Sequence, residues 1–250
     1  MGRPFSLVAI FTVLTVSLAG CQGLDSGLGE APDNHISTSA SGLLVSQDGA
    51  ATVETVVASA PAWICIQADD AGKPGVVLGC SRVSAGESRN VQVEVETAGL
   101  TPNVHLVMYE DAGAPGEFEI PEPDSPVLTA LGRPVSSEQT LLGDPTWIGV
   151  QDQPLGAGNT VSVDRVYSPV PALLVIHDGR DARVLGYTPV DPGVSENVVV
   201  SLEVRGEIGA IFAELHWDTR GPGELNLSDP AAKLASGEYL MAHFQVTGAN

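Results

Sequence analysis

Two short segments of the chain combine imidazole and carboxylate groups at the ends of predicted β-strands. His177 and Asp178 end one such strand, and His216 and Asp218 end another. If the two strands are neighbours in one sheet, these four side chains gather at one edge, where His nitrogen and Asp oxygen atoms can bind a divalent metal ion. The alternative, which we favour at this stage, is a structural network in which each His hydrogen-bonds a nearby Asp.

Other chemical signatures are weak or missing. The sequence has no Gly-x-Ser-x-Gly, His-Glu-x-x-His, Cys-x-x-Cys or phosphate-loop motif, so we predict that the protein is not an enzyme. The segments 111–117 and 218–224 hint at calcium loops but lack the alternating oxygen ligands of an EF-hand. No cofactor is therefore expected other than the divalent metal considered above.

The elements that must position these residues occur twice along the chain. The segment 61–67 matches the segment 171–177 at an offset of 110 residues, and from Val77 and Val184 onward the offset is 107 through the Pro-Gly-Glu motifs at 115–117 and 222–224. A constant offset over this length indicates a tandem duplication, with one copy at 43–141 and the other at 147–250. The first copy has Gln67-Ala68 where the second has His177-Asp178, so the scaffold does not require the imidazole.

Each copy has the pattern of a β-protein. The segment 90–96 alternates apolar and polar residues strictly, as a half-buried strand does, and short runs rich in Val and Ile are separated by Gly, Pro, Asp and Asn. No segment keeps a helical apolar period, although 230–235 could form a single helical turn. Short strands in copies of about 100 residues predict an all-β fold of two tandem immunoglobulin-like β-sandwich domains. Trp63, Trp147 and Trp217 lie in apolar runs and are expected in the cores rather than on a sugar-stacking surface.

The N-terminal segment predicts export and membrane anchoring. Arg3 precedes an apolar run that ends in Leu-Ala-Gly-Cys, and this tetrad resembles the lipobox of bacterial lipoproteins. The resemblance implies that residues 1–20 are a signal peptide and that Cys21 is lipidated after cleavage. An ordinary cleaved leader with an incidental cysteine is the alternative. Residues 21–42 are rich in Gly, Ser, Thr and Asp, and are expected to form a flexible tether.

The copies also resemble an uncharacterised domain family of secreted proteins from halophilic archaea and some bacteria. Its members have a strand ending in Val-Ile-His-Asp, a Leu-Gly turn, and a later strand ending in His-x-Asp. The second copy matches this pattern at 175–178, 185–186 and 216–218, whereas the first copy keeps only Asp111 of the last motif. The resemblance implies a β-domain at the cell surface and no particular activity.

Cys65 and Cys80 remain as an even pair once Cys21 is set aside. Both lie at predicted strand positions that flank one loop, so that a cross-strand disulfide is geometrically possible in an exported protein. The alternative is a pair of buried free thiols. The second copy has Val175 and Tyr187 at these positions, so the bridge would add to the fold without being required for it.

Charge excludes some partners. The chain has 31 acidic and 11 basic residues, for a formal net charge of −20. So few basic residues argue against a nucleic-acid partner and against electrostatic binding to anionic lipids. We therefore predict a non-catalytic lipoprotein of the cell envelope, anchored by Cys21 to a bilayer on the extracytoplasmic side and acting in binding or envelope structure. A lipoprotein that binds a metal or small ligand through copy 2 is the alternative, and the sequence does not identify a protein or envelope partner.

Overall fold

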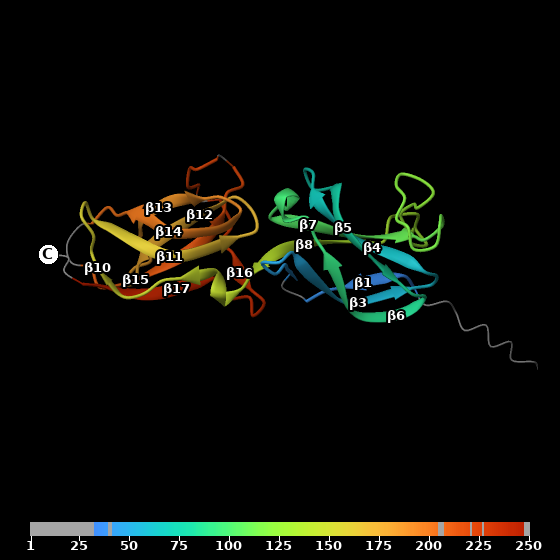
Figure 1. Ribbon diagram of the computed structural model, residues 1–250, viewed down its shortest axis with the longest axis horizontal. Helices are drawn as coiled ribbons and strands as arrows, with labels where there is room; N and C mark the ends of the chain where they lie inside the picture. The colour runs from blue at the N-terminus through green and yellow to red at the C-terminus, as the bar shows by residue number, and fades with distance from the viewer. Residues whose placement is uncertain (1–32, 40–41, 205–207, 221, 227, 248–250) are drawn as a thin grey trace, which may run out of the picture. The chain divides into compact units, whose positions relative to one another are not determined.

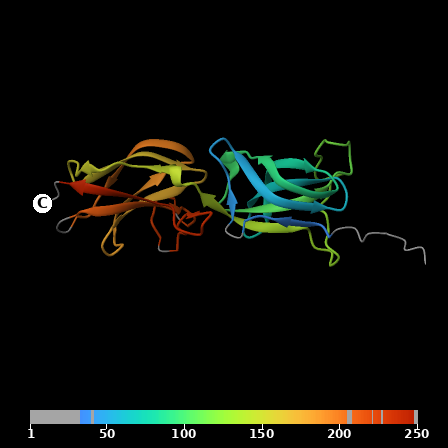
Figure 2. The ribbon, with the colours of Figure 1, turned by 90° about the horizontal axis from the view of Figure 1, so that it is seen from below.

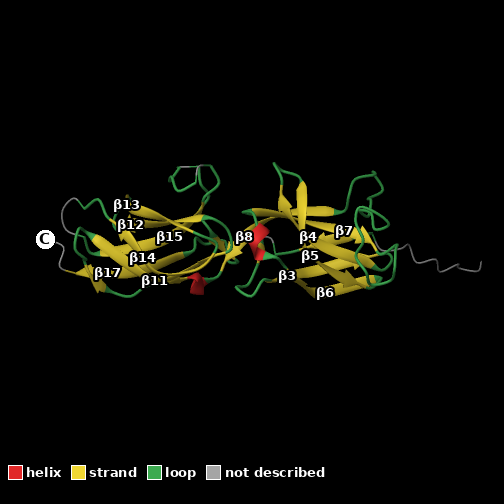
Figure 3. Cartoon of the chain, turned by 45° about the horizontal axis from the view of Figure 1, so that its top comes forward, coloured by secondary structure: helices red, strands yellow, loops and turns green. Residues whose placement is uncertain are grey.

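The computed structural model describes residues 33–39, 42–204, 208–220, 222–226 and 228–247. Within these ranges the chain consists of β-strands and two single-turn 3-10 helices, η1 (Thr97–Gly99) and η2 (Pro145–Trp147), as Figure 3 shows. The prediction of two tandem all-β domains is confirmed. The single helical turn considered for 230–235 is absent, and this segment instead contains the short strand β16 (Lys233–Leu234). None of the helices in the described ranges has the length and apolar character needed to cross a membrane.

The first domain contains two sheets. Its strands are β1 (His35–Ser37), β2 (Leu43–Leu44), β3 (Ala50–Ala58), β4 (Ala62–Asp69), β5 (Pro74–Val83), β6 (Gly86–Glu94), β7 (Asn103–Glu110) and β8 (Ser136–Gly143). The smaller sheet has the order β1-β3-β6, and the larger has the order β16-β8-β7-β4-β5, with β2 also paired to β8. In Figures 1 and 2 the ribbon of β3 and β6 forms one layer and that of β4, β5 and β7 the other.

The second domain repeats this plan. Its remaining strands are β9 (Ile148–Gly149), β10 (Gln153–Pro154), β11 (Thr160–Ser168), β12 (Ala172–Asp178), β13 (Val184–Val190), β14 (Gly193–Ser201), β15 (Ala210–Trp217) and β17 (Met241–Thr247). One sheet has the order β14-β11-β9 and the other the order β10-β17-β15-β12-β13. The central strands β4 and β12 thus occupy equivalent places in the two domains.

The burial of each strand follows from its place in the sheet. β6 and β14 form only one strand pairing each, and their residues alternate between exposed and partly buried, as expected for an edge strand with one face toward the core. Every residue of β12 is buried because the strand has neighbours on both sides and is covered on both faces. Trp147 and Trp217 are fully buried, which confirms the expected core packing, and Trp63 is only 9% exposed.

The C-terminal part of the predicted tether differs from expectation where it is described, at 33–39 and 42. His35–Ser37 form β1, which pairs antiparallel with β3, and the side chain of Ile36 packs against the core. One apolar residue and the free edge of β3 place this segment in the sheet. The prediction that the flexible tether extends to residue 42 is therefore wrong for His35–Ser37. The signal peptide 1–20 and Cys21 lie outside the described residues.

The Leu-Gly motifs form β-bulges within strands and not turns. In the second domain Ile176 pairs with Gly186 and His177 with Val184, so that Leu185 is an extra residue in β13. In the first domain Leu78 is the corresponding extra residue, beside Gly79. A bulge re-aims the side chains on either side of it, and here it lies beside His177.

Candidate metal centre

Strands β12 and β15 bring the two histidines of the second domain together. The strands are antiparallel neighbours, with His177 opposite Phe212 and Leu173 opposite His216. Because alternate residues of a strand share a face, Glu214 lies on the same face of β15 as His216 and Phe212. Glu214 is therefore the residue on that face between His216 and Phe212, which lies opposite His177. The other face of β12 carries Leu174 and Ile176 into the core. The sheet thus presents two imidazoles and one carboxylate on the face that points away from the core.

The donor atoms of these three side chains converge. The Nε2 atoms of His177 and His216 are 3.1 Å and 3.0 Å from the same carboxylate oxygen, Oε2 of Glu214. The three ligand atoms lie within 4.8 Å of one another, and no other group of three or more His, Cys, Asp and Glu residues in the described chain meets this condition. His177 and Glu214 are each 8% exposed. The cluster is therefore compact and largely shielded from water.

Backbone carbonyls fix the tautomer of both imidazoles. Nδ1 of His177 lies 2.9 Å from the carbonyl oxygen of Ala182, and Nδ1 of His216 lies 3.1 Å from that of Asp229. A carbonyl oxygen only accepts hydrogen bonds, so each Nδ1 carries the proton and donates it. In the neutral form of each ring, the lone pair is then on Nε2, directed toward Glu214. Phe212 stacks on the His177 ring at 4.8 Å between centroids and 6° between planes, which further fixes its orientation.

The structure excludes Asp178 and Asp218 from the cluster. Asp178 follows His177 directly, so its side chain points to the other face of the strand, where it accepts hydrogen bonds from the backbone and guanidinium of Arg180. These hydrogen bonds from Arg180 outweigh burial and lower the pKa of Asp178. Asp218 lies beyond the end of β15 and accepts from the backbone N–H of Gly223, 2.7 Å away. The predicted four-residue ligand set is thus wrong in its two aspartates.

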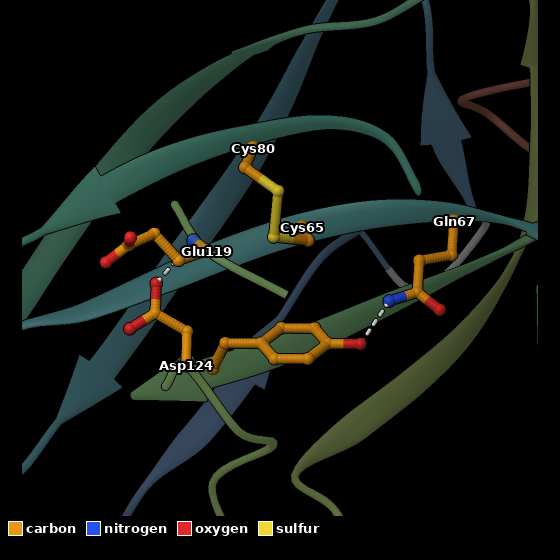
Figure 4. The surroundings of a disulfide bond; sticks show 6 residues. Cys65, Gln67, Cys80, Glu119 and Asp124 are labelled. Carbon is orange, nitrogen blue, oxygen red and sulfur yellow. Dashed lines mark hydrogen bonds between the residues drawn. A yellow bond between two sulfur atoms is a disulfide. The ribbon is translucent and has the colours of Figure 1, made fainter. Parts of the chain in front are cut away.

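These and one further aspartate organise the loops around the cluster. The Asp178–Arg180 turn leads to Ala182, whose carbonyl oxygen accepts the hydrogen bond from His177 Nδ1. Asp229, which is 5% exposed, accepts hydrogen bonds from the backbone of Thr219 and Asn226 and so holds the loop that presents its own carbonyl to His216. Asp124 accepts from backbone N–H groups in the equivalent loop of the first domain, which is visible at Glu119 in Figure 4. This loop support belongs to the scaffold of both domains.

The cluster lies in the wall of an open pocket of about 490 Å3. Besides the three donors, Phe212, Tyr239 and Met241 contribute to its lining. One side of the cluster is therefore accessible to a small ligand, while the sheet closes the other.

The electrostatics of the cluster couple the carboxylate to the imidazoles. Burial disfavours the charged form of Glu214, but the interactions with His177 and His216 outweigh it and lower the pKa of Glu214 to about 2. Burial likewise opposes the charged form of His216, and the contact with Glu214 more than compensates, so that the pKa of His216 is raised. Glu214 is thus an anion at neutral pH, as a metal ligand must be.

The first domain has different residues at every position of the cluster. Gln67, Val107 and Tyr109 occupy the positions of His177, Glu214 and His216, and the amide of Gln67 donates to the Tyr109 hydroxyl at 2.6 Å (Figure 4). Nearby, Cys65 and Cys80 lie directly opposite each other on β4 and β5 and form a disulfide, with the Cα atoms 4.1 Å apart. The same backbone therefore supports a neutral hydrogen-bonded pair in one domain and an ionisable cluster in the other.

Sequence reasoning found the two histidines and missed Glu214. The usable signal was the Glu-x-His spacing in β15, since residues two apart in a strand share a face. The adjacent aspartates were selected because they are close in sequence, although neighbouring residues of a strand point to opposite faces.

The fold and the cluster together define a protein of two β-sandwich domains, of which the second carries a convergent His-Glu-His group. The chain belongs to the family described as "Domain of unknown function (DUF7282)", whose model matches residues 40–141 and 147–247. No curated protein matches the chain. Among solved structures it is similar to "Biofilm associated protein - BSP domain", with 10% identity and a TM-score of 0.23. That similarity covers 82% of this chain, which spans only 30% of the other.

Proposed function

We propose that this protein is a membrane-anchored lipoprotein of the cell envelope that acts by binding and not by catalysis. In this proposal Cys21 carries the lipid, the first domain is structural, and the second domain holds the ligand. The observation that carries the binding role is the difference between two otherwise equivalent sites. Gln67 and Tyr109 form a neutral hydrogen-bonded pair in the first domain, whereas the second domain has the ionisable His-Glu-His cluster at an open pocket.

The extracytoplasmic location has two supports of different kinds. The Leu-Ala-Gly-Cys tetrad resembles a lipobox, and several acyl chains on one cysteine hold a protein firmly to a bilayer. The Cys65–Cys80 disulfide is typical of proteins that fold outside the reducing cytosol. An acidic chain with a net charge of −20 would also stay soluble beyond its anchor.

Intact mass of the protein extracted from membranes of its native host tests the anchoring. We expect a chain that begins at Cys21 and carries a diacylglyceryl and an acyl increment, with the Cys21→Ala variant remaining unprocessed or unmodified. A soluble wild-type chain with an unmodified Cys21 would refute the proposed location. The binding role is tested separately below, because it does not depend on how the chain is anchored.

A further inference from the structure

We propose that the second domain binds one divalent transition-metal ion of the Zn²⁺ class through Nε2 of His177, Nε2 of His216 and the Glu214 carboxylate. This deepens the binding function proposed above, since it names the chemical class of the ligand, and it rests on that function for the role of the second domain. It replaces the aspartates expected from the sequence with a glutamate.

The donor set selects the class of metal. Imidazole nitrogen with one carboxylate suits Zn²⁺, and also Cu²⁺ and Ni²⁺, whereas Ca²⁺ and Mg²⁺ take oxygen ligands throughout. Two His and one Glu with a fourth position left open is a ligand set used for zinc in proteins. The open pocket beside Tyr239 and Met241 leaves space for water or a small exogenous ligand at that fourth position.

The spacing of the donors is close to that of a zinc polyhedron. Two ligands at about 2.0–2.1 Å from a tetrahedral ion lie about 3.3 Å apart. The two Nε2 to Oε2 separations are 3.1 Å and 3.0 Å, and all three atoms lie within 4.8 Å. The two Nε2 atoms must therefore move closer together by side-chain adjustment before both reach one ion.

A second, independent observation also indicates a ligand. Nε2 of His177 is buried and has no hydrogen-bond partner among the described residues, because its contact with Glu214 lacks hydrogen-bond geometry. An unsatisfied buried polar atom is destabilising, and such atoms are rare in native proteins. A metal ion at the centre of the cluster satisfies this atom, His216 Nε2 and the Glu214 carboxylate at once.

The surroundings already have the second-shell arrangement of a metal site. Histidines that bind a metal through one nitrogen usually donate the other N–H to a carbonyl or carboxylate, which fixes ring orientation and raises basicity. Both Nδ1 atoms do so here, toward Ala182 and Asp229. The two carbonyls are held in turn by the turn at Asp178 and by the buried carboxylate of Asp229. The imidazoles are thus oriented before any ion arrives.

Zinc titration of the full-length protein in detergent tests the proposal. Protein stripped with a chelator is titrated with Zn²⁺ by calorimetry, and retained metal is counted by mass spectrometry after dialysis. We expect one equivalent per chain. A triple variant replaces the three donors with the residues at the equivalent positions of the first domain, as His177→Gln, Glu214→Val and His216→Tyr. It should fold and lose that equivalent, with affinity reduced by more than about 100-fold, since loss of second-shell partners alone costs about 10–100-fold.

Further variants keep the test decisive. Glu214→Gln removes one ligand charge with little change of shape and should weaken zinc binding. This variant tests the proposal by itself if the triple variant does not fold. Glu196→Gln, at an exposed position of β14, is the matched control and should keep the full equivalent, because Glu196 lies outside the cluster and its loops. No stoichiometric metal in the wild type, or an equivalent retained by Glu214→Gln at unchanged affinity, would overturn the proposal. Lipid on Cys21 together with absent zinc binding would leave the anchoring intact and reject the metal alone.

Discussion

At the scale of single residues, His105 and Asp69 form a hydrogen-bonded pair in the first domain. His105 Nε2 lies 2.7 Å from Asp69 Oδ1, and His105 is 5% exposed. The hydrogen bond from His105 lowers the pKa of Asp69 below its usual value. A depressed carboxylate pKa means that the unfolded chain binds the proton more tightly, so that acid favours unfolding.

This contact makes a pH-dependent contribution to stability. It is fully present above the ordinary Asp pKa of about 3.9 and is lost as pH falls through the lower folded-state pKa. Asp69→Asn should lower the unfolding free energy of the first domain by about 1 kcal/mol at pH 7. The penalty measured at neutral pH should shrink at an acid pH that protonates Asp69 in the folded chain. Domain-resolved hydrogen exchange in urea measures it, with Asp70→Asn as control, and an equal penalty at both pH values would contradict the assignment.

The limits of sequence reasoning are clearest at this scale. His177 and His216 could be selected from residue type and strand position, but their third partner depends on cross-strand register. The register that brings Glu214 beside His177 belongs to the pairing of β12 with β15, and nothing in a single sequence fixes that register. Strand alternation could have directed attention from Asp218 to Glu214. The burial of Nε2 of His177 could only be seen in three dimensions.

At the scale of elements, the bulges depend on glycine. A Cβ atom on Gly186 would lie 2.1 Å from the carbonyl oxygen of Ser201, and one on Gly79 would lie 1.9 Å from that of Glu94. The extra residues Leu78 and Leu185 also accept backbone hydrogen bonds from the segments that follow β6 and β14. Only glycine permits this close approach of two backbones.

Gly186→Ala should therefore separate β13 from the end of β14. We expect a loss of roughly 1–3 kcal/mol in the second domain from overpacking, and weaker zinc binding because the bulge fixes the start of the His177 turn. Hydrogen exchange of β12–β14 peptides and zinc calorimetry measure the two effects. Gly149→Ala, where the new methyl meets only ordinary contacts of 3.7 Å and more, serves as control. Unchanged exchange in both variants would show that the bulge tolerates a side chain.

The disulfide between β4 and β5 is an added constraint on one domain. Cys65→Val with Cys80→Tyr introduces the residues that the second domain has at these positions. The bridge spans 15 residues, for which the loop-entropy model gives about 3 kcal/mol. We expect the first domain to lose about this much stability and the second to be unaffected, as read from hydrogen exchange. Two reactive thiols in denatured, unreduced wild-type protein would reject the bridge itself.

The fold at this scale was largely predictable. Runs of Val and Ile between Gly, Pro and Asn gave the strands of both copies, and the repeat gave their equivalence. Strand β1 was not predictable, because a three-residue edge strand with one apolar side chain, Ile36, has too little pattern to distinguish it from a linker. Its position is decided by the free edge of β3, a tertiary property.

At the scale of the whole molecule, the two copies share one backbone plan and carry different side chains at one site. The loop carboxylates Asp124 and Asp229 remain in both, whereas the cluster residues differ at all three positions. Changes at the cluster have therefore left the loop carboxylate in place.

The first domain therefore has the backbone and the loop carboxylate of the cluster without its three donor residues. Gln67→His, Val107→Glu and Tyr109→His would place the donor set of the second domain on a sheet that already has the supporting loop of Asp124. We expect a second zinc equivalent in calorimetry, weaker than the first, because the segment 69–75 is three residues longer than 179–182, the segment whose Ala182 carbonyl orients His177. If the grafted chain folds and still binds a single ion, the three ligands alone are not sufficient, and the loop carbonyls that orient the imidazoles in the second domain contribute more to zinc affinity than the ligands do. If the second equivalent appears, three substitutions are enough to give a domain of this fold an ion without any change to its backbone architecture.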